Sequence, residues 1–112
     1  MKTYAMALDL IDDPEVIEEY KKHHRRVWPE VKQGLEEIGI SEMKIFLTGC
    51  RLFMFLRTED EFDLEKDFQK YTDTSPRARM WDDLMRIFQQ RIPSAKIGDW
   101  WVPMEEVFNL EW

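Results

Sequence analysis

Cysteine is almost absent from this chain of 112 residues: Cys50 stands alone, so no disulfide can form within the chain. A lone cysteine is typical of proteins in reducing compartments, and we expect the cytoplasm. Long hydrophobic runs are missing as well. None approaches the roughly 20 residues that a membrane-spanning helix needs, and no basic segment followed by an apolar stretch marks a secretory signal. The sequence therefore predicts no contact with a membrane.

Glycine is scarce and scattered, with four residues and no GxGxxG or GxxxxGK run that would cradle a phosphate. Nucleotide cofactors are therefore not expected. His23 and His24 point about 100° apart on a regular helix and cannot chelate one ion, and Cys50 lacks a CxxC partner, so we expect no metal. Basic charge is also in short supply, because the net charge is -7. This disfavours nucleic acid and anionic membrane surfaces as partners.

Apolar and charged residues are abundant, at 44% and 35% of the chain, a balance typical of a folded globular domain. The length predicts one domain over residues 1–112, with a core that needs no disulfides. Aromatic residues make up 13% of the sequence, with five Trp, three Tyr and seven Phe. That is more than the packing of so short a chain needs, so we expect some of these rings to line a pocket.

Hydrophobic periodicity, proline and glycine divide the chain into helices and strands. The expected elements are a strand at 3–10, a helix from about Pro14 to Trp28, a second helix from Pro29 to about Ile38, hairpin strands at 42–47 and 51–57, a short helix within 58–74, a helix from Pro76 to Pro93 and a last strand at 102–110. This order predicts a ferredoxin-like α+β sandwich, an antiparallel sheet with helices on one face. The free sheet face is also apolar, and a second copy commonly covers such a face, so we expect a homodimer.

One position on the apolar stripe of the first helix carries an imidazole. His24 follows Tyr20 by four residues, so the two side chains lie one above the other on an inward-pointing helix face. Burial there can tune the pKa of the imidazole. Such a histidine can simply be hydrogen-bonded core, and Trp81 on the later helix can simply be packing. Together, a His–Tyr pair and spare tryptophans suit a small neutral sugar, whose C–H face stacks on indole rings.

These residues are part of a longer pattern, Glu19-Tyr20-x-x-x-His24-x-x-x-Trp28-Pro29-Glu30, that resembles the L-rhamnose mutarotase family. The resemblance spans essentially the whole chain and continues in Ile45-Phe46-Leu47, Leu52-Phe53, Trp81 with Met85, and Glu106-Val107-Phe108-x-Leu110. It implies a dimeric ferredoxin-like fold and a cofactor-independent enzyme that interconverts the α and β anomers of a pyranose. It also implies that His24 is the proton donor and that Tyr20 and Trp81 contact the sugar.

Two positions depart from the rhamnose-specific relatives. Met43 stands where they have a tyrosine, and Trp81-Asp82 stands where they have a Trp-Trp pair. The substrate is therefore expected to be a 6-deoxy-L-hexose, either L-rhamnose or L-fucose, with Met43 and Asp82 contacting the ring hydroxyls whose orientation differs. We expect Trp100 or Trp101 to close the mouth of the pocket, and we count Trp101 among the substrate contacts.

Mutarotation requires one acid and one base, and each positioned group is worth a rate factor of about 10²–10⁴. We expect His24 to donate a proton to the ring oxygen O5, while Tyr20 or a nearby carboxylate handles the O1 proton. Glu106 is a candidate for this carboxylate because it shares a face of the predicted last strand with Met104 and Phe108. We therefore place Glu106 in the pocket with the substrate contacts.

Two other functions fit parts of the sequence. Cofactorless monooxygenases of polyketides have similar small dimeric folds with Trp and His in the pocket, although the pattern from Tyr20 to Pro29 does not resemble theirs. A non-catalytic domain for sugar sensing or subunit assembly would bind a sugar, or none, without accelerating anomer exchange.

Overall fold

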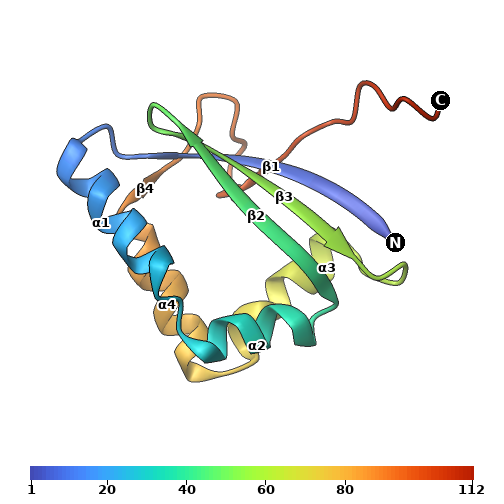
Figure 1. Cartoon of the computed structure of the whole chain (residues 1–112), viewed down its shortest axis with the longest axis horizontal. Coiled ribbons are helices and arrows are strands. Elements are labelled where there is room, and N and C mark those ends of the chain that lie inside the picture. The colour runs from blue at the N-terminus through green and yellow to red at the C-terminus, as the bar shows by residue number, and fades with distance from the viewer.

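The computed structural model describes residues 1–112. In chain order the elements are β1 (Lys2–Leu10), α1 (Pro14–Arg25), α2 (Pro29–Glu37), β2 (Ile40–Thr48), β3 (Arg51–Thr58), α3 (Leu64–Lys70), the short 3-10 helix η1 (Tyr71–Asp73), α4 (Pro76–Arg86), β4 (Gln89–Gln90) and β5 (Val102–Pro103). The sheet is antiparallel with strand order β2-β3-β1-β4, and β5 pairs with β1. The helices lie on one side of it (Figure 1). The predicted ferredoxin-like α+β fold is confirmed.

Side chains alternate between the two faces of the sheet, as the pleat of a strand requires. Leu8 of β1 stands opposite Leu52 of β3, and Met6 stands opposite Met54. All four are buried between the sheet and the helices. The other face of the sheet carries aromatic side chains that no element of this chain covers; Phe46 there is 56% exposed. The core therefore forms on one face only.

The break between α1 and α2 lies where the sequence predicts it. Asp13 begins α1 by accepting a hydrogen bond from the backbone N–H of Glu15. Trp28 has an extended backbone, with φ -60° and ψ 139°, because the ring of the following Pro29 disfavours helical geometry at the residue before it. The chain therefore changes direction at Trp28, and α2 runs across the sheet at a different angle from α1 (Figure 1).

Two predicted boundaries are wrong. The helix expected to continue to Pro93 ends at Arg86, because Gln89 and Gln90 leave it to pair with the last two residues of β1 as β4. The strand expected at 102–110 is only Val102–Pro103, where it pairs with β1. The Met104 N–H still donates to the Ala5 carbonyl oxygen of β1, at 2.8 Å. Farther along, the chain has no neighbouring strand, and side chains such as Phe108, 70% exposed, stand in solvent.

The C-terminal segment lies outside the layers formed by the sheet and the helices. It runs past β1 and away from the body of the molecule (Figure 1). No helix is both long enough and apolar enough to span a membrane.

The hydrophobic core consists of two clusters, one around Tyr20 and Trp81 and one around Met54 and Phe62. The candidate site lies where the two clusters meet beneath β2 and β3.

Candidate active site

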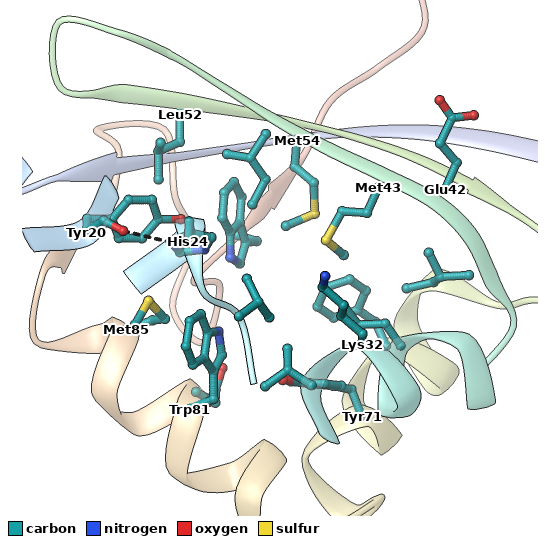
Figure 2. Close-up of a pocket in the computed structure, with 18 of the residues that line it drawn as sticks. Tyr20, His24, Lys32, Glu42, Met43, Leu52, Met54, Tyr71, Trp81 and Met85 are labelled. Atoms are coloured by element: carbon teal, nitrogen blue, oxygen red, sulfur yellow. Dashed lines mark hydrogen bonds between the residues drawn. The ribbon is translucent and has the colours of Figure 1, made fainter. Parts of the chain in front are cut away.

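A cavity of about 670 Å³ opens between the helical face of the sheet and helices α1, α2 and α4. This volume is within the range typical of small-molecule sites. Its walls are mainly apolar, with the thioethers of Met43 and Met54 projecting into it from the sheet and Trp81 from α4 (Figure 2). Polar side chains reach it from the helices, as shown for His24 in the same figure. A mostly apolar hollow with a few convergent polar groups is the usual form of a ligand site.

The structure brings together all but one of the site residues predicted from the sequence. Those lining the cavity are Tyr20, His24, Met43, Trp81, Asp82 and Trp101. Glu106 does not line it. Its carboxylate is exposed and accepts a hydrogen bond from the Asn109 side-chain amide, at 2.9 Å, within the C-terminal segment. The strand face on which Glu106 was predicted does not exist, because β5 ends at Pro103.

His24 is held by its own helix and by two aromatic rings. Its ring centroid lies 4.1 Å from that of Tyr20 and 5.4 Å from that of Trp81, which it meets edge-on. Its Nδ1 lies 2.9 Å from the backbone carbonyl oxygen of Tyr20. A carbonyl only accepts hydrogen bonds, so this geometry assigns the proton to Nδ1 and leaves a lone pair on Nε2. The ring is therefore placed to accept a proton through Nε2.

Burial sets the protonation state of His24. Desolvation lowers the pKa of its imidazole below the ordinary value of 6.5, and the nearby His23 lowers it further, while the hydrogen bond to the Tyr20 carbonyl opposes them. The neutral ring is consequently the dominant form at pH 7. A neutral imidazole with a free Nε2 is a competent general base.

Tyr20 is 4% exposed and its pKa is perturbed in the opposite direction. Burial raises the pKa of the phenol well above its usual range, and the polar side chain of Gln89 partly offsets this rise. The hydroxyl therefore keeps its proton across the working range of pH. It can serve the cavity as a hydrogen-bond donor, whereas complete loss of its proton is unfavourable.

A second polar cluster lies at the α4 wall of the cavity. Burial raises the pKa of Asp82, and the guanidinium of Arg86, whose nearest nitrogen lies 3.4 Å from a carboxylate oxygen, opposes that rise. The Tyr71 hydroxyl is buried with no hydrogen-bond partner. Burial raises the pKa of Tyr71, and the charge of Asp82 raises it further. Asp82 thus occupies the cavity as a partly desolvated carboxyl group where a sugar hydroxyl would find an acceptor.

Sequence reasoning missed most of the polar residues that line the cavity, among them Lys32, Tyr71 and Gln89. Lys32 reads as an ordinary exposed position on α2, yet Figure 2 shows its amine directed toward Met43 across the cavity. Tyr71 reads as a core position of a short helix. Gln89 lies in what was predicted to be the end of a long helix. No local pattern distinguishes these residues, because each reaches the cavity only through the packing of separate elements.

Comparisons with known proteins agree with this geometry. The chain matches the model of the L-rhamnose mutarotase family over residues 3–110. It is 54% identical to a Dictyostelium discoideum protein over 99% of this chain and 91% of that one. It is 34% identical to an L-fucose mutarotase of Xanthomonas campestris pv. campestris, over 98% of this chain and 89% of that one.

A solved structure has the same architecture. The L-rhamnose mutarotase of Formosa agariphila superposes with a TM-score of 0.70 at 28% sequence identity, covering 98% of this chain and 99% of that one. The similarity in sequence and in structure therefore extends over the full set of elements that build the cavity. With the family model matched from β1 to the C-terminal segment, and with His24, Tyr20 and Trp81 around one hollow, the chain belongs to the L-rhamnose mutarotase family.

Proposed function

We propose that the protein is a mutarotase, a carbohydrate isomerase that interconverts the α and β pyranose anomers of a 6-deoxy-L-hexose. The observation that carries this proposal is the imidazole of His24, whose Nδ1 is tied to the backbone of Tyr20 and whose Nε2 is left free in the cavity. The relatives described above include an L-fucose and an L-rhamnose mutarotase. None of them supports the monooxygenase or the non-catalytic alternative.

Neutral His24 is sufficient to carry the proton through the reaction. Its Nε2 accepts the proton of O1–H while the C1–O5 bond breaks, so that O1 becomes the aldehyde oxygen. The imidazolium then gives that proton to O5, which becomes a hydroxyl. Rotation about the C1–C2 bond turns the other face of the aldehyde toward O5, and the same steps in reverse close the ring. Each cycle returns His24 to its neutral form.

The surrounding residues support this step. The Tyr20 hydroxyl, which retains its proton, donates a hydrogen bond to O5 as charge develops on it. The indole of Trp81 stacks on the C–H face of the pyranose. Asp82 accepts a hydrogen bond from a ring hydroxyl, and Met43 packs against the apolar part of the sugar. We propose Trp101 as a further wall of the same subsite.

Anomer-exchange NMR tests the function directly. In saturation-transfer experiments at neutral pH, we expect the protein to accelerate exchange between the α and β anomers of L-fucose, L-rhamnose or both. D-glucose, whose C6 carries a hydroxyl instead of a methyl group, serves as the control and should exchange near its uncatalysed rate. No acceleration with any 6-deoxy-L-hexose would contradict the proposed activity. The ratio of the two rates identifies the preferred sugar, because L-fucose and L-rhamnose differ in the orientation of the C2 and C4 hydroxyls.

We propose that the enzyme is a homodimer formed through the open face of the sheet. Phe46 and Phe53 lie side by side there, with ring centroids 6.0 Å apart, and are 56% and 36% exposed. Ala7 stands opposite Phe53 in the ladder between β1 and β3, and its side chain is too small to cover the phenyl ring of Phe53. An apolar surface of this kind is typical of an interface between copies.

The substitution Phe53→Asp tests the dimer. A charge at the centre of an apolar interface costs several kcal/mol when it is desolvated, so we expect the variant to be a monomer. Light scattering coupled to size-exclusion chromatography measures the mass. Ile97→Asp, at a side chain that is fully exposed in a loop, is the matched control and should leave the dimer intact. A monomeric wild-type protein, or a dimeric Phe53→Asp variant, would contradict this interface.

We propose the cytoplasm as the compartment of the enzyme. Cys50 is a free thiol at the β2–β3 turn, and reducing compartments keep such thiols unpaired. Cell fractionation measures this location, and recovery of the protein in a secreted or membrane fraction would contradict it.

A further inference from the structure

The segment between β4 and β5 ends in a pair of tryptophans, of which only one lines the cavity. Trp101 lines it and packs against both clusters of the hydrophobic core. Trp100, the residue before it, does not line the cavity, and the reaction steps and sugar contacts given above leave it without a role. A side chain beside a cavity wall can still act on that wall through the backbone that the two residues share.

The segment 91–101 has few attachments to the rest of the molecule. It follows β4 and ends where Val102 pairs with Ala7 of β1. Ile92 is buried near its start, whereas Ile97 is fully exposed. The backbone hydrogen bonds of the segment join residues within it and reach no other element. A stretch with so few buried contacts opens at little cost in free energy unless a further contact holds it.

That further contact is a side-chain hydrogen bond. The indole N–H of Trp100 donates to Oε1 of Gln89, and this is the only hydrogen bond between the segment 91–101 and another part of the chain. Gln89 is a fixed partner, because it is 8% exposed and pairs with Leu10 of β1. A buried acceptor is costly to leave without its donor. The bond therefore ties the end of the segment to the sheet.

Two guanidinium groups add to this attachment. Those of Arg86, at the end of α4, and Arg91 each lie 5.5 Å from the ring centroid of Trp100, within the range of a favourable cation–π contact. Arg86 also forms an ion pair at 3.4 Å with Asp82, which lines the cavity. The ring of Trp100 is therefore in contact with α4 as well as with β4.

We propose that Trp100 is a positioning residue, whose hydrogen bond to Gln89 holds the segment 91–101 against the body of the protein and thereby keeps Trp101 in the wall of the sugar site. The proposal rests on the mutarotase function given above, in which Trp101 is a wall of the sugar subsite. Neighbouring residues share one planar peptide unit, so fixing Trp100 restricts the backbone from which Trp101 projects. Trp100 acts without touching the substrate.

The substitution Trp100→Phe tests this attachment, because phenylalanine keeps an aromatic ring beside the guanidinium groups and lacks the indole N–H. We expect KM for L-fucose or L-rhamnose, whichever the wild type prefers, to rise about three- to tenfold, as for the loss of one hydrogen bond. The value of kcat should stay nearly unchanged, because the Trp101 wall binds substrate and transition state alike.

Trp112→Phe is the matched control for this variant. It is the same chemical change at a side chain of the C-terminal segment that is 77% exposed and does not line the cavity. Both constants should therefore keep their wild-type values. Thermal melting checks that both variants fold.

A double-mutant cycle separates positioning from a general loss of stability. Trp101→Leu removes the indole wall, so adding Trp100→Phe to it should raise KM no further. An equal rise of KM with and without Trp101, or a loss confined to kcat, would overturn the proposal. An active wild-type enzyme in which Trp100→Phe matches Trp112→Phe would overturn only the role of Trp100, whereas a wild-type protein without exchange activity would remove the proposed function itself.

Backbone dynamics give a readout that does not depend on activity. In ¹⁵N relaxation measurements we expect order parameters of about 0.85 for residues 99–101 of the wild type, as in rigid backbone, and a fall toward about 0.6 in Trp100→Phe. The order parameters of β1 should be the same in both proteins. Equal values at residues 99–101 in the wild type and in Trp100→Phe would overturn the attachment, whatever the effect on activity.

Discussion

Replacing His24 with Asn should abolish anomer exchange above the uncatalysed background. His24 is the only histidine that lines the cavity, and its Nε2 is free because Nδ1 bonds to the helix backbone. Removing a positioned acid–base group costs about 10²–10⁴-fold in rate. Asn can keep the hydrogen bond to the helix backbone, so we expect the fold to survive. Saturation-transfer NMR with L-fucose and L-rhamnose measures the loss.

The adjacent histidine supplies the control for this experiment. His23 makes the same kind of bond on the same helix, from its Nδ1 to the carbonyl oxygen of Glu19 at 2.7 Å. Its ring packs beside Phe88, with centroids 5.4 Å apart, and does not line the cavity. His23→Asn should therefore retain nearly full activity. If His24→Asn kept its activity, or if both variants lost it equally, His24 would be removed from the mechanism.

Activity should also collapse in acid. Burial holds the pKa of His24 below 6.5, so the base is fully present at neutral pH. As pH falls through the pKa of the folded protein, Nε2 gains a proton and loses its lone pair. We expect kcat/KM, corrected for the uncatalysed rate, to be flat above pH 6.5 and to fall about tenfold per pH unit below the pKa of His24. A rate that rises with acidity would identify the imidazolium as the starting form instead.

The same titration affects stability with a definite sign. The pKa of His24 is lowered by folding, so the unfolded chain binds the proton more tightly than the native state does. This contribution to the free energy of unfolding is complete above pH 6.5 and is lost as pH falls from there through the pKa of the folded protein. Urea unfolding of the wild type and of His24→Asn between pH 5 and 8 should show this loss in the wild type only. Parallel curves would contradict a desolvated imidazole.

Local sequence signals predicted the parts of the fold that depend on neighbours along the chain. Pro29 predicted the break after α1, because its ring acts on the residue directly before it. The four-residue spacing of Tyr20 and His24 predicted that their rings would lie together, as they do at 4.1 Å. Position on a helix face is a property of the helix itself, so one sequence is enough to derive it.

The wrong predictions concern segments whose secondary structure depends on residues far away in the sequence. The stripe from Ala78 continues at helical spacing beyond Arg86, yet the chain leaves the helix because the end of β1 offers Gln89 and Gln90 backbone partners. Glu106 was predicted on a strand face, but strand structure requires a neighbouring strand, and the backbone pairing with β1 ends before Glu106. Hydrogen-bond partners of this kind are supplied by tertiary structure, which no local pattern encodes.

The amino-acid order alone determined the α+β sandwich, the inward-facing imidazole with its phenol, and the likeness to sugar mutarotases, since these follow from periodicity, spacing and motif. Tertiary structure alone decided the tautomer of His24, the position of Glu106 outside the cavity, and the hydrogen bond between Trp100 and Gln89. The physical reason is the range of the interactions. Periodic patterns report contacts within a turn or a strand, whereas proton positions and pKa values depend on groups that only the folded chain brings within a few ångströms.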